Sequence, residues 1–229
     1  ELIIGGAALN KDVEAFLTKI KFPVTVGYGM TECAPLISYV NTSKHRLGSC
    51  GKIVDRMEAR IESPDPARVP GVLKVRGANV MLGYYKNEEA TASCMQDGWL
   101  DTGDICTMDA DGHLYIKGRN KNMILGPSGQ NIYPEEIEQV LNSLPYVSES
   151  LIVTRDGGTL VGLVHADGDA IEEDKLSDKA LDEVMAQNLK QLNAEIPAYA
   201  RVQRLELMDK EFEKTPKRSI KRYLYQEQA

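Results

Sequence analysis

The chain has 229 residues, of which 42% are hydrophobic and 27% charged, and this composition is typical of a globular protein rather than a disordered one. The formal net charge of -7 argues against a general nucleic-acid binder, because an acidic surface repels a phosphate backbone. No apolar run approaches the ~20 residues of a membrane-spanning helix, so we expect no transmembrane segment.

The first residue indicates how the chain was produced, and the cysteines indicate the cellular compartment. The chain begins at Glu1, without an initiator methionine or an apolar leader, which suggests a mature or excised fragment. Four cysteines lie far apart without a Cys-x-x-Cys pair, and only three histidines could assist them. We therefore expect reduced thiols in a cytoplasmic protein and neither a zinc site nor a disulfide framework.

The first 32 residues predict a βαβ unit. Residues 2–6 and 23–27 have the composition of short strands, and apolar residues between them recur at helical spacing: Val13, Phe16, Leu17 and Ile20. Parallel strands leave their functional loops at their carboxyl ends. Both of these ends are rich in glycine, at residues 5–7 and 27–32.

From residue 47 the pattern changes to short strands separated by turns. Strands are expected at residues 53–61, 71–76, 104–108 and 113–117, and Asp111-Gly112 marks a hairpin between the last two. These segments predict a small antiparallel sheet or β-barrel.

A second unit with an α+β pattern follows residue 118. Pro134 suits a first helical position, strands at 150–153 and 160–164 flank a glycine turn, and Ser177 caps a longer helix that Pro197 ends. A strand at 202–207 leads into a basic tail, and the helix that begins at Pro134 is expected to be short. The expected class is therefore α/β followed by α+β.

Three segments carry possible chemistry. In GYGMTE (27–32), the Thr31 hydroxyl could bind phosphate and the Glu32 carboxylate could bind a hard cation, although a plain strand-to-turn junction has the same pattern. In WLDTGD (99–104), Asp104 is expected in a turn, as an acceptor for a ribose diol or as a backbone cap. Residues 211–222 carry five basic and two acidic side chains, which could form a solvated face.

Taken together and in this order, the motifs resemble those of the adenylate-forming (AMP-binding) enzymes, and most closely a bacterial long-chain fatty acid CoA ligase. The segments that carry the resemblance are GGAAL (5–9), GYGMTE (27–32), GVLKVRG (71–77), MLGYYKN (81–87), DGWLDTGD (97–104), GRNKNMI (118–124), SGQNIYPEEIE (128–138) and KTPKRSIKR (214–222). The resemblance runs from end to end, and the stretch 118–138 is its most specific part.

The resemblance implies a role for each matching residue. Gly5, Gly6 and Ala7 match the loop beside adenine, Thr31 the threonine at the ATP phosphates, Glu32 the magnesium ligand, and Asp104 and Arg119 the residues that contact the ribose and nucleotide. Lys121 matches a hinge between a large domain that ends at residue 119 and a mobile lid formed by residues 120–229. The loop from Gly126 to Gly129 would approach the CoA thiol after the lid rotates.

The implied activity has two half-reactions. A carboxylic acid and ATP give an acyl-adenylate and pyrophosphate, and the acyl group then passes to CoA. We expect ATP, Mg²⁺ and CoA as cofactors and a fatty acid as the substrate, with peripheral membrane contact left open. The chain matches the C-terminal portion of such an enzyme, so we do not expect it to turn over alone.

One departure concerns the basic tail. The family pattern has a lysine where this chain has Ser219, and a hydroxyl cannot supply a fixed positive charge to the phosphate. Either Lys217 or Lys221 replaces that lysine, or adenylation is slow. We favour Lys217, because residues two apart on a strand share one face. An amino-acid adenylation domain that loads a carrier protein, and a non-catalytic nucleotide-binding relative, remain alternatives.

Overall fold

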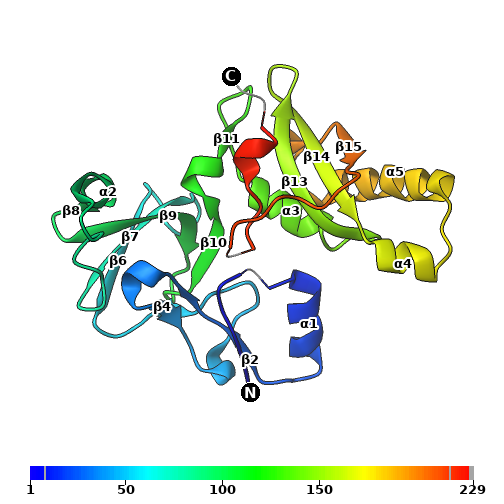
Figure 1. The fold of residues 1–229 in the computed structure, drawn as a ribbon. Coiled ribbons are helices and arrows are strands. Elements are labelled where there is room, and N and C mark those ends of the chain that lie inside the picture. The colour runs from blue at the N-terminus through cyan, green and yellow to red at the C-terminus, as the bar shows by residue number, and fades with distance from the viewer. Residues whose placement is uncertain (8, 217, 227–229) are drawn as a thin grey trace. The chain divides into compact units, whose positions relative to one another are not determined.

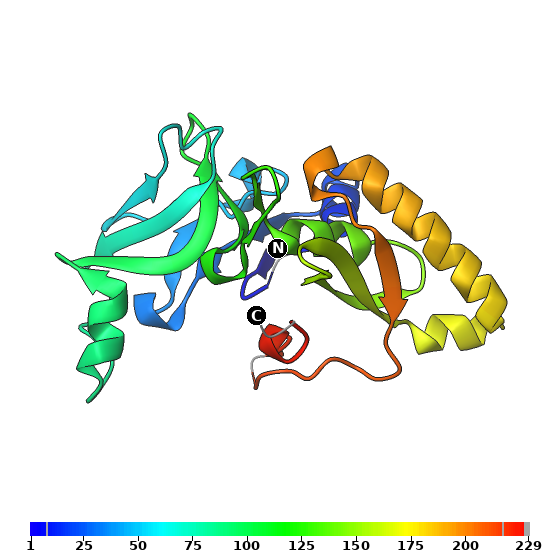
Figure 2. The same cartoon turned by 90° about the horizontal axis from the view of Figure 1, so that it is seen from above.

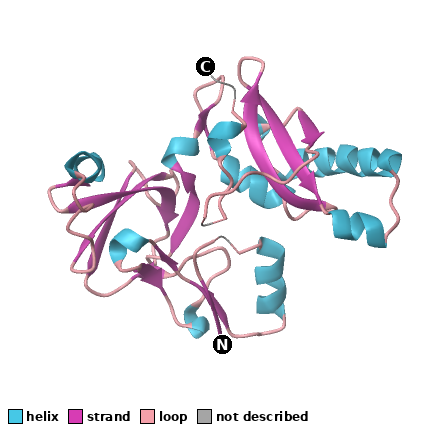
Figure 3. Ribbon diagram, viewed as in Figure 1, coloured by secondary structure: helices cyan, strands magenta, loops and turns pink. Residues whose placement is uncertain are grey.

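The computed structural model describes residues 1–7, 9–216 and 218–226, and it divides the chain into two compact units (Figure 1). The N-terminal unit is Glu1–Lys121 and the C-terminal unit is Asn122–Ala229. Strands dominate the N-terminal unit, whereas the longest helix lies in the C-terminal unit (Figure 3). Each unit has its own hydrophobic core, so each is described separately.

The N-terminal unit begins with the predicted βαβ arrangement. It consists of β1 (Leu2–Ile4), α1 (Lys11–Lys19) and β2 (Val24–Val26), and β1 pairs with β2 in parallel. The side chain of Asn10 caps α1 by accepting the N–H groups of Asp12 and Val13. The parallel pairing confirms the βαβ prediction.

The apolar stripe that predicted α1 is exposed in this unit. Val13, Phe16 and Ile20 are 47%, 59% and 53% exposed, whereas Glu14 on the other side of the helix is 2% exposed. The Glu14 carboxylate lies 2.7 Å from Nε2 of His45 and accepts the backbone N–H of Gly48 at 2.9 Å. The buried side of α1 is thus held by polar contacts to the loop at 45–48.

Two antiparallel sheets complete the N-terminal unit. The first contains β3 (Tyr28–Gly29), β4 (Leu36–Tyr39) and β5 (Lys52–Ile53). The second contains β6 (Met57–Glu62), β7 (Gly71–Gly77), β8 (Met95–Gln96), β9 (Trp99–Met108) and β10 (Leu114–Arg119), in the order β10-β9-β7-β6 with β8 also on β9. Its core includes Leu73, Val75, Leu100, Cys106 and Leu114. The predicted antiparallel sheet and its β9–β10 hairpin are confirmed, while α2 (Glu88–Cys94) was not predicted.

Close backbone packing at Gly71 makes β7 sensitive to substitution. A Cβ atom at Gly71 would lie 2.3 Å from the carbonyl oxygen of Glu62 on β6. Gly71→Ala should therefore destabilise the full-length protein by about 1–3 kcal/mol, the usual cost of overpacking a core. Thermal unfolding measures this change. Gly168→Ala is the matched control, because a Cβ there meets no atom within 4 Å, and an unchanged midpoint for Gly71→Ala would contradict the packing argument.

The C-terminal unit is an α+β fold. It consists of β11 (Ile124–Leu125), β12 (Asn131–Ile132), α3 (Pro134–Leu141), β13 (Val147–Arg155), β14 (Thr159–Ala166), α4 (Gly168–Glu173), α5 (Asp178–Glu195), β15 (Arg204–Leu207) and a final 3₁₀ turn (Arg222–Leu224). Pro134 is in the first turn of α3, and Ser177 caps α5, both as predicted. β13 and β14 form the predicted hairpin, and β15 pairs with β14 in parallel.

Both faces of the β13-β14-β15 sheet are covered. On one face α3 and α5 bury Ile137, Leu141, Met185 and Leu192 together with Ile152 and Val164 of the strands. On the other face the tail after β15 buries Phe212 against β13 and β14. Figure 2 shows α5 and the tail on opposite sides of this sheet. The tail is therefore a packed part of the unit.

The pKa of every cysteine is raised above its ordinary value. All four are free thiols, and burial raises the pKa of Cys33 and Cys50 to about 11 and that of Cys106 to about 12. In the described part of the chain, no helix has the length and apolar character needed to cross a membrane.

Candidate functional site

Two glycine-rich loops meet at the carboxyl ends of β1 and β2. The N–H of Gly27 donates to the carbonyl of Ile4 at 2.8 Å, and a Cβ atom at Gly5 would lie 3.4 Å from the carbonyl oxygen of Gly27. Gly6 has φ +88°, a conformation that favours glycine. The structure thus brings Gly5, Gly6 and Ala7 next to the start of the GYGMTE segment.

Asp104 lies within a strand rather than in the turn expected from the sequence. Strand β9 runs from Trp99 to Met108 because it pairs with β7 on one side and β10 on the other. A left-handed residue, Gly103 with φ +68°, precedes Asp104. The Asp104 side chain is almost completely buried, at 4% exposure, and its register partner across the ladder is Arg119.

The carboxylate of Asp104 contacts two predicted motifs. Its Oδ1 atom lies 2.8 Å from Nε of Arg119, and its Oδ2 atom accepts a hydrogen bond from the hydroxyl of Tyr28. Arg119 also donates to the carbonyl of Thr102 at 3.2 Å. Burial, and next the charge of Asp104, raise the pKa of Tyr28, so this hydroxyl stays protonated and donates. The structure therefore joins GYGMTE to β9 and β10 through one carboxylate.

Sequence reasoning missed Tyr28 as a member of this cluster. Its position in the middle of GYGMTE was the available signal, but the partner of its hydroxyl lies 76 residues away in the chain. Only the pairing of β9 with β10, and the return of the chain through β3, place the three side chains together.

Thr31 and Glu32 lie in a short 3₁₀ turn after β3. Thr31 is exposed, and Oε1 of Glu32 accepts the hydroxyl of Tyr84 at 2.9 Å. This hydrogen bond is the main cause that raises the pKa of Tyr84 to about 12. Asn79 holds the turn by donating to the carbonyl of Cys33 at 2.7 Å. The motif is thus an ordered turn that presents a hydroxyl and a carboxylate.

The carboxylate of Glu32 can bind Mg²⁺ only as one ligand among several, the others coming from substrate and water. Among the described residues, no group of three or more His, Cys, Asp or Glu side chains could hold a metal. Mg²⁺ is often bound by one or two carboxylates together with substrate phosphates and water. The single half-buried carboxylate of Glu32 fits a site of that kind.

In the C-terminal unit, the segment from Gly126 to Gly129 forms a tight turn between β11 and β12. Gly126 donates to the carbonyl of Gln130 at 2.8 Å, and Gly129 donates to that of Gly126 at 2.9 Å with φ +81°. At the other end of β11, Lys121 is exposed and is the last residue of the N-terminal unit.

The basic tail also forms a turn, and this corrects the strand argument for Lys217. Lys214 and Ile220 make an antiparallel bridge, Thr215 donates to the carbonyl of Ser219 at 2.8 Å, and Arg218 has φ +61°. We call residues 214–216 and 218–220 the basic turn. Strand spacing is the wrong basis for choosing Lys217, because the chain reverses here. Lys217 itself lies outside the described residues.

Most described cations of the tail are bound within the C-terminal unit. Nζ of Lys214 lies 2.8 Å from Glu149, Nζ of Lys221 lies 3.2 Å from Glu213, and Arg222 pairs with Glu138. Of the basic residues that the structure describes between 211 and 222, Arg218 alone has no ion pair. The tail is therefore not simply a solvated basic face.

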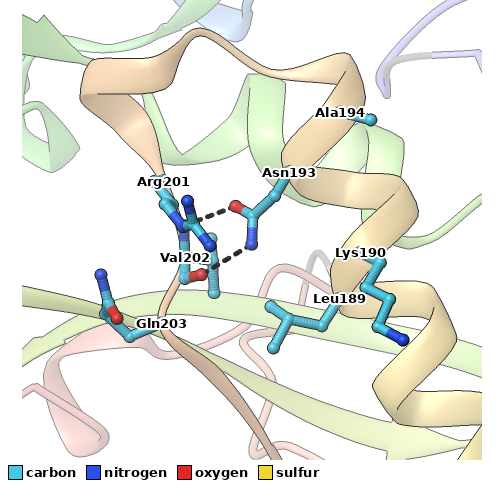
Figure 4. A pocket seen from close by; sticks show the side chains of 7 residues that line it. All are labelled: Leu189, Lys190, Asn193, Ala194, Arg201, Val202 and Gln203. Carbon is cyan, nitrogen blue, oxygen red and sulfur yellow. Dashed lines mark hydrogen bonds between the residues drawn. The ribbon is translucent and has the colours of Figure 1, made fainter.

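A separate groove of about 320 Å³ lies between α5 and the segment before β15 (Figure 4). Asn193 crosses it, and its amide donates to and accepts from the backbone of Val202 at 2.8 and 2.9 Å. None of the site residues predicted from the sequence lines this groove. We assign it no ligand.

Comparison with known families matches both units. Residues 1–85 match the family of AMP-binding enzymes, and residues 121–228 match the C-terminal domain of AMP-binding enzymes. The chain belongs to the AMP-binding enzyme family. This result confirms the resemblance to adenylate-forming enzymes that the motifs indicated.

Individual relatives of this AMP-binding chain are CoA ligases. It is 44% identical over 155 residues to the long-chain-fatty-acid–CoA ligase of Yersinia pestis, covering 65% of this chain and 27% of that protein. It is 38% identical over 187 residues to the 2-succinylbenzoate–CoA ligase of Bacillus cytotoxicus, covering 76% of this chain and 38% of that protein. The matched segments thus span well under half of these relatives.

Solved structures of the o-succinylbenzoate CoA synthetase from Bacillus subtilis confirm the fold class. The complex with its acyl-adenylate intermediate has a TM-score of 0.82 at 26% identity, covering 99% of this chain and 46% of that one. The complex with ATP and a magnesium ion has a TM-score of 0.79 at 26% identity, covering 97% and 46%. These ligands belong to that enzyme.

Proposed function

We propose that this chain is part of an ATP-dependent acyl-CoA synthetase that forms an acyl-adenylate and transfers the acyl group to CoA. The observation that carries the proposal is the buried Asp104 carboxylate, which contacts Tyr28 of the GYGMTE segment and Arg119 of β10. An ionised carboxylate can only accept hydrogen bonds, so the hydroxyls of a neutral diol are suitable donors to it.

Each site residue of the N-terminal unit has a part in nucleotide binding. Gly5, Gly6 and Ala7 border the adenine, and Asp104 and Arg119 contact the ribose. The hydroxyl of Thr31 donates to a phosphate oxygen. Glu32 would hold Mg²⁺, which would neutralise charge on the phosphates during adenylation.

The C-terminal unit contributes to both half-reactions. We assign the hinge to Lys121, the large domain to residues 1–119 and the mobile lid to residues 120–229. The turn from Gly126 to Gly129 lies near the thiol of CoA after rotation, and its glycines allow close approach of backbone to ligand. The positive charge for adenylation comes from Lys217. Lys221 is the weaker candidate, because Glu213 binds its ammonium group.

The acid is a long-chain fatty acid in this proposal, and the enzyme acts in the cytoplasm. Identity to the long-chain-fatty-acid ligases is 44–46%, against 38% for the 2-succinylbenzoate ligase and 35% for a feruloyl-CoA synthase. The full-length protein should release pyrophosphate with ATP and palmitate and form palmitoyl-CoA. Faster turnover of 2-succinylbenzoate would overturn the choice of acid, and no acyl-CoA from any acid would overturn the enzyme assignment.

Removal of the Tyr28 hydroxyl tests the cluster around Asp104. Tyr28→Phe keeps the ring and deletes the donor to Oδ2, so the KM for ATP should rise about tenfold, the effect of losing one hydrogen bond to a charged group. Steady-state pyrophosphate release measures it. Tyr115→Phe is the matched control, since its hydroxyl contacts Asp109 instead at 3.1 Å. Equal effects of the two variants would exclude a specific role for Tyr28.

A further inference from the structure

The basic turn is fixed to the C-terminal unit at its base. Phe212 and Tyr225 meet edge to face with ring centroids 5.2 Å apart, and they pack with Ile220 on the sheet face opposite α5. The hydroxyl of Tyr225 accepts the N–H of Glu213, and Arg155 donates to the carbonyl of Tyr225, both at 2.7 Å. The chain before and after the turn thus rests on one apolar cluster.

Arg222 adds a buried ion pair directly after the turn. Its guanidinium makes a two-pronged contact with the carboxylate of Glu138 on α3, with Nη1 to Oε1 at 2.8 Å. The two side chains are only 16% and 10% exposed. Oε1 of Glu138 also accepts the N–H of Ile152 on β13 at 2.7 Å. Arg222 therefore joins the tail to a helix and a strand through fixed geometry.

The polar contacts continue from Arg222 to the start of the C-terminal unit. Nη2 of Arg222 lies 3.8 Å from Oε1 of Glu135, and the same oxygen accepts the side-chain amide of Asn122 at 2.5 Å. Asn122 is the first residue of this unit. One chain of contacts therefore joins the residue after the proposed hinge to the base of the basic turn.

We propose that Arg222 is a positioning residue, which through Glu138, Glu135 and Asn122 holds the basic turn in fixed register with the hinge end of the C-terminal unit. The proposal rests on the proposed function. Rotation about Lys121 then carries the cations of the turn to the reacting phosphate without local rearrangement. Arg222 does not itself contact substrate.

The test uses Arg222→Gln in the full-length protein, with two readouts. The backbone amide of Thr215 donates to the carbonyl of Ser219, and that of Lys221 donates to the carbonyl of Glu213. Hydrogen exchange at these two amides should become at least tenfold faster. The amide of Met208, which donates to the carbonyl of Val164, should stay protected. The kcat for adenylation should fall about tenfold with the KM for ATP nearly unchanged, and thioester formation from supplied acyl-adenylate should be retained. Arg222→Lys, which keeps the charge, should give intermediate values and serves if the glutamine variant does not fold.

Arg204→Gln is the matched control, because Arg204 pairs with Glu206 at 2.7 Å on the exposed surface of the same unit. It should match the parent in both readouts. Parent-like exchange at Thr215 and Lys221 in Arg222→Gln would overturn the proposal, and so would an equal loss of both half-reactions, which indicates a general folding defect. If the parent itself formed no acyl-CoA, the proposed function would fail, and the exchange result alone would decide whether Arg222 holds the turn.

Discussion

Asp104→Asn should lower kcat/KM for ATP on the order of 100-fold in the full-length protein, because the amide removes the charge that accepts the ribose hydroxyls in the proposed function. Asparagine has nearly the shape of aspartate, so the buried site stays filled. Its amide group also places a donor where Arg119 or Tyr28 now donates. Pyrophosphate release at varied ATP measures the change.

A nucleotide analogue makes this test specific for the ribose. The parent should use 2′-deoxy-ATP far less well than ATP, and Asp104→Asn should reduce that preference to a few-fold, because the carboxylate that distinguishes the two is gone. Asp101→Asn is the matched control, since its carboxylate accepts the backbone N–H of Gly103 at 2.8 Å. An undiminished preference for ATP in Asp104→Asn would show that another residue contacts the ribose.

Lys217→Ala should lower the rate of adenylation by 10²–10³, the typical cost of removing a charge that stabilises a transition state. Thioester formation from supplied acyl-adenylate should be retained, because the phosphate chemistry is then complete. Separate assays of pyrophosphate release and of CoA consumption from purified adenylate measure the two half-reactions. Equal loss in both would contradict an assignment of Lys217 to adenylation alone.

Substitutions at Ser219 and Arg218, close to Lys217 in the chain, test which residue supplies the positive charge for adenylation. Lys217→Ala combined with Ser219→Lys should recover much of the lost adenylation, because it restores the lysine of the family pattern. Arg218→Ala should change the rate less than threefold, as expected for a surface side chain that does not contact substrate. If Arg218→Ala instead reproduces the loss and Lys217→Ala does not, the charge comes from Arg218, whose side chain is exposed and without an ion pair among the described residues.

Local patterns predicted the secondary structure well where local rules dominate. Helical spacing and a first-turn proline indicated α3, a serine cap indicated α5, and glycine turns indicated the hairpins β9–β10 and β13–β14. The short helices α2 and α4 were missed, because six or seven residues carry too little periodicity to detect.

The same patterns failed where distant contacts decide. The apolar stripe of α1 is exposed in this unit. The buried side of the helix is the one that carries Glu14, whose carboxylate contacts His45 and Gly48. The basic tail was taken as a strand, but the bridge between Lys214 and Ile220 closes it into a turn. Charge and spacing along a sequence do not reveal such partners.

The motifs of the chain alone established its family and named nearly every candidate residue, since glycines, hydroxyls and carboxylates at fixed spacing reflect local backbone and chemical needs. Tertiary structure was needed to show that Tyr28 and Arg119 share the carboxylate of Asp104. It was also needed to show that Arg222 of the basic tail forms an ion pair with Glu138. The Tyr28–Asp104 and Glu138–Arg222 contacts join residues 76 and 84 positions apart. They depend on strand pairing and helix packing, which bring distant side chains together and which no local pattern encodes.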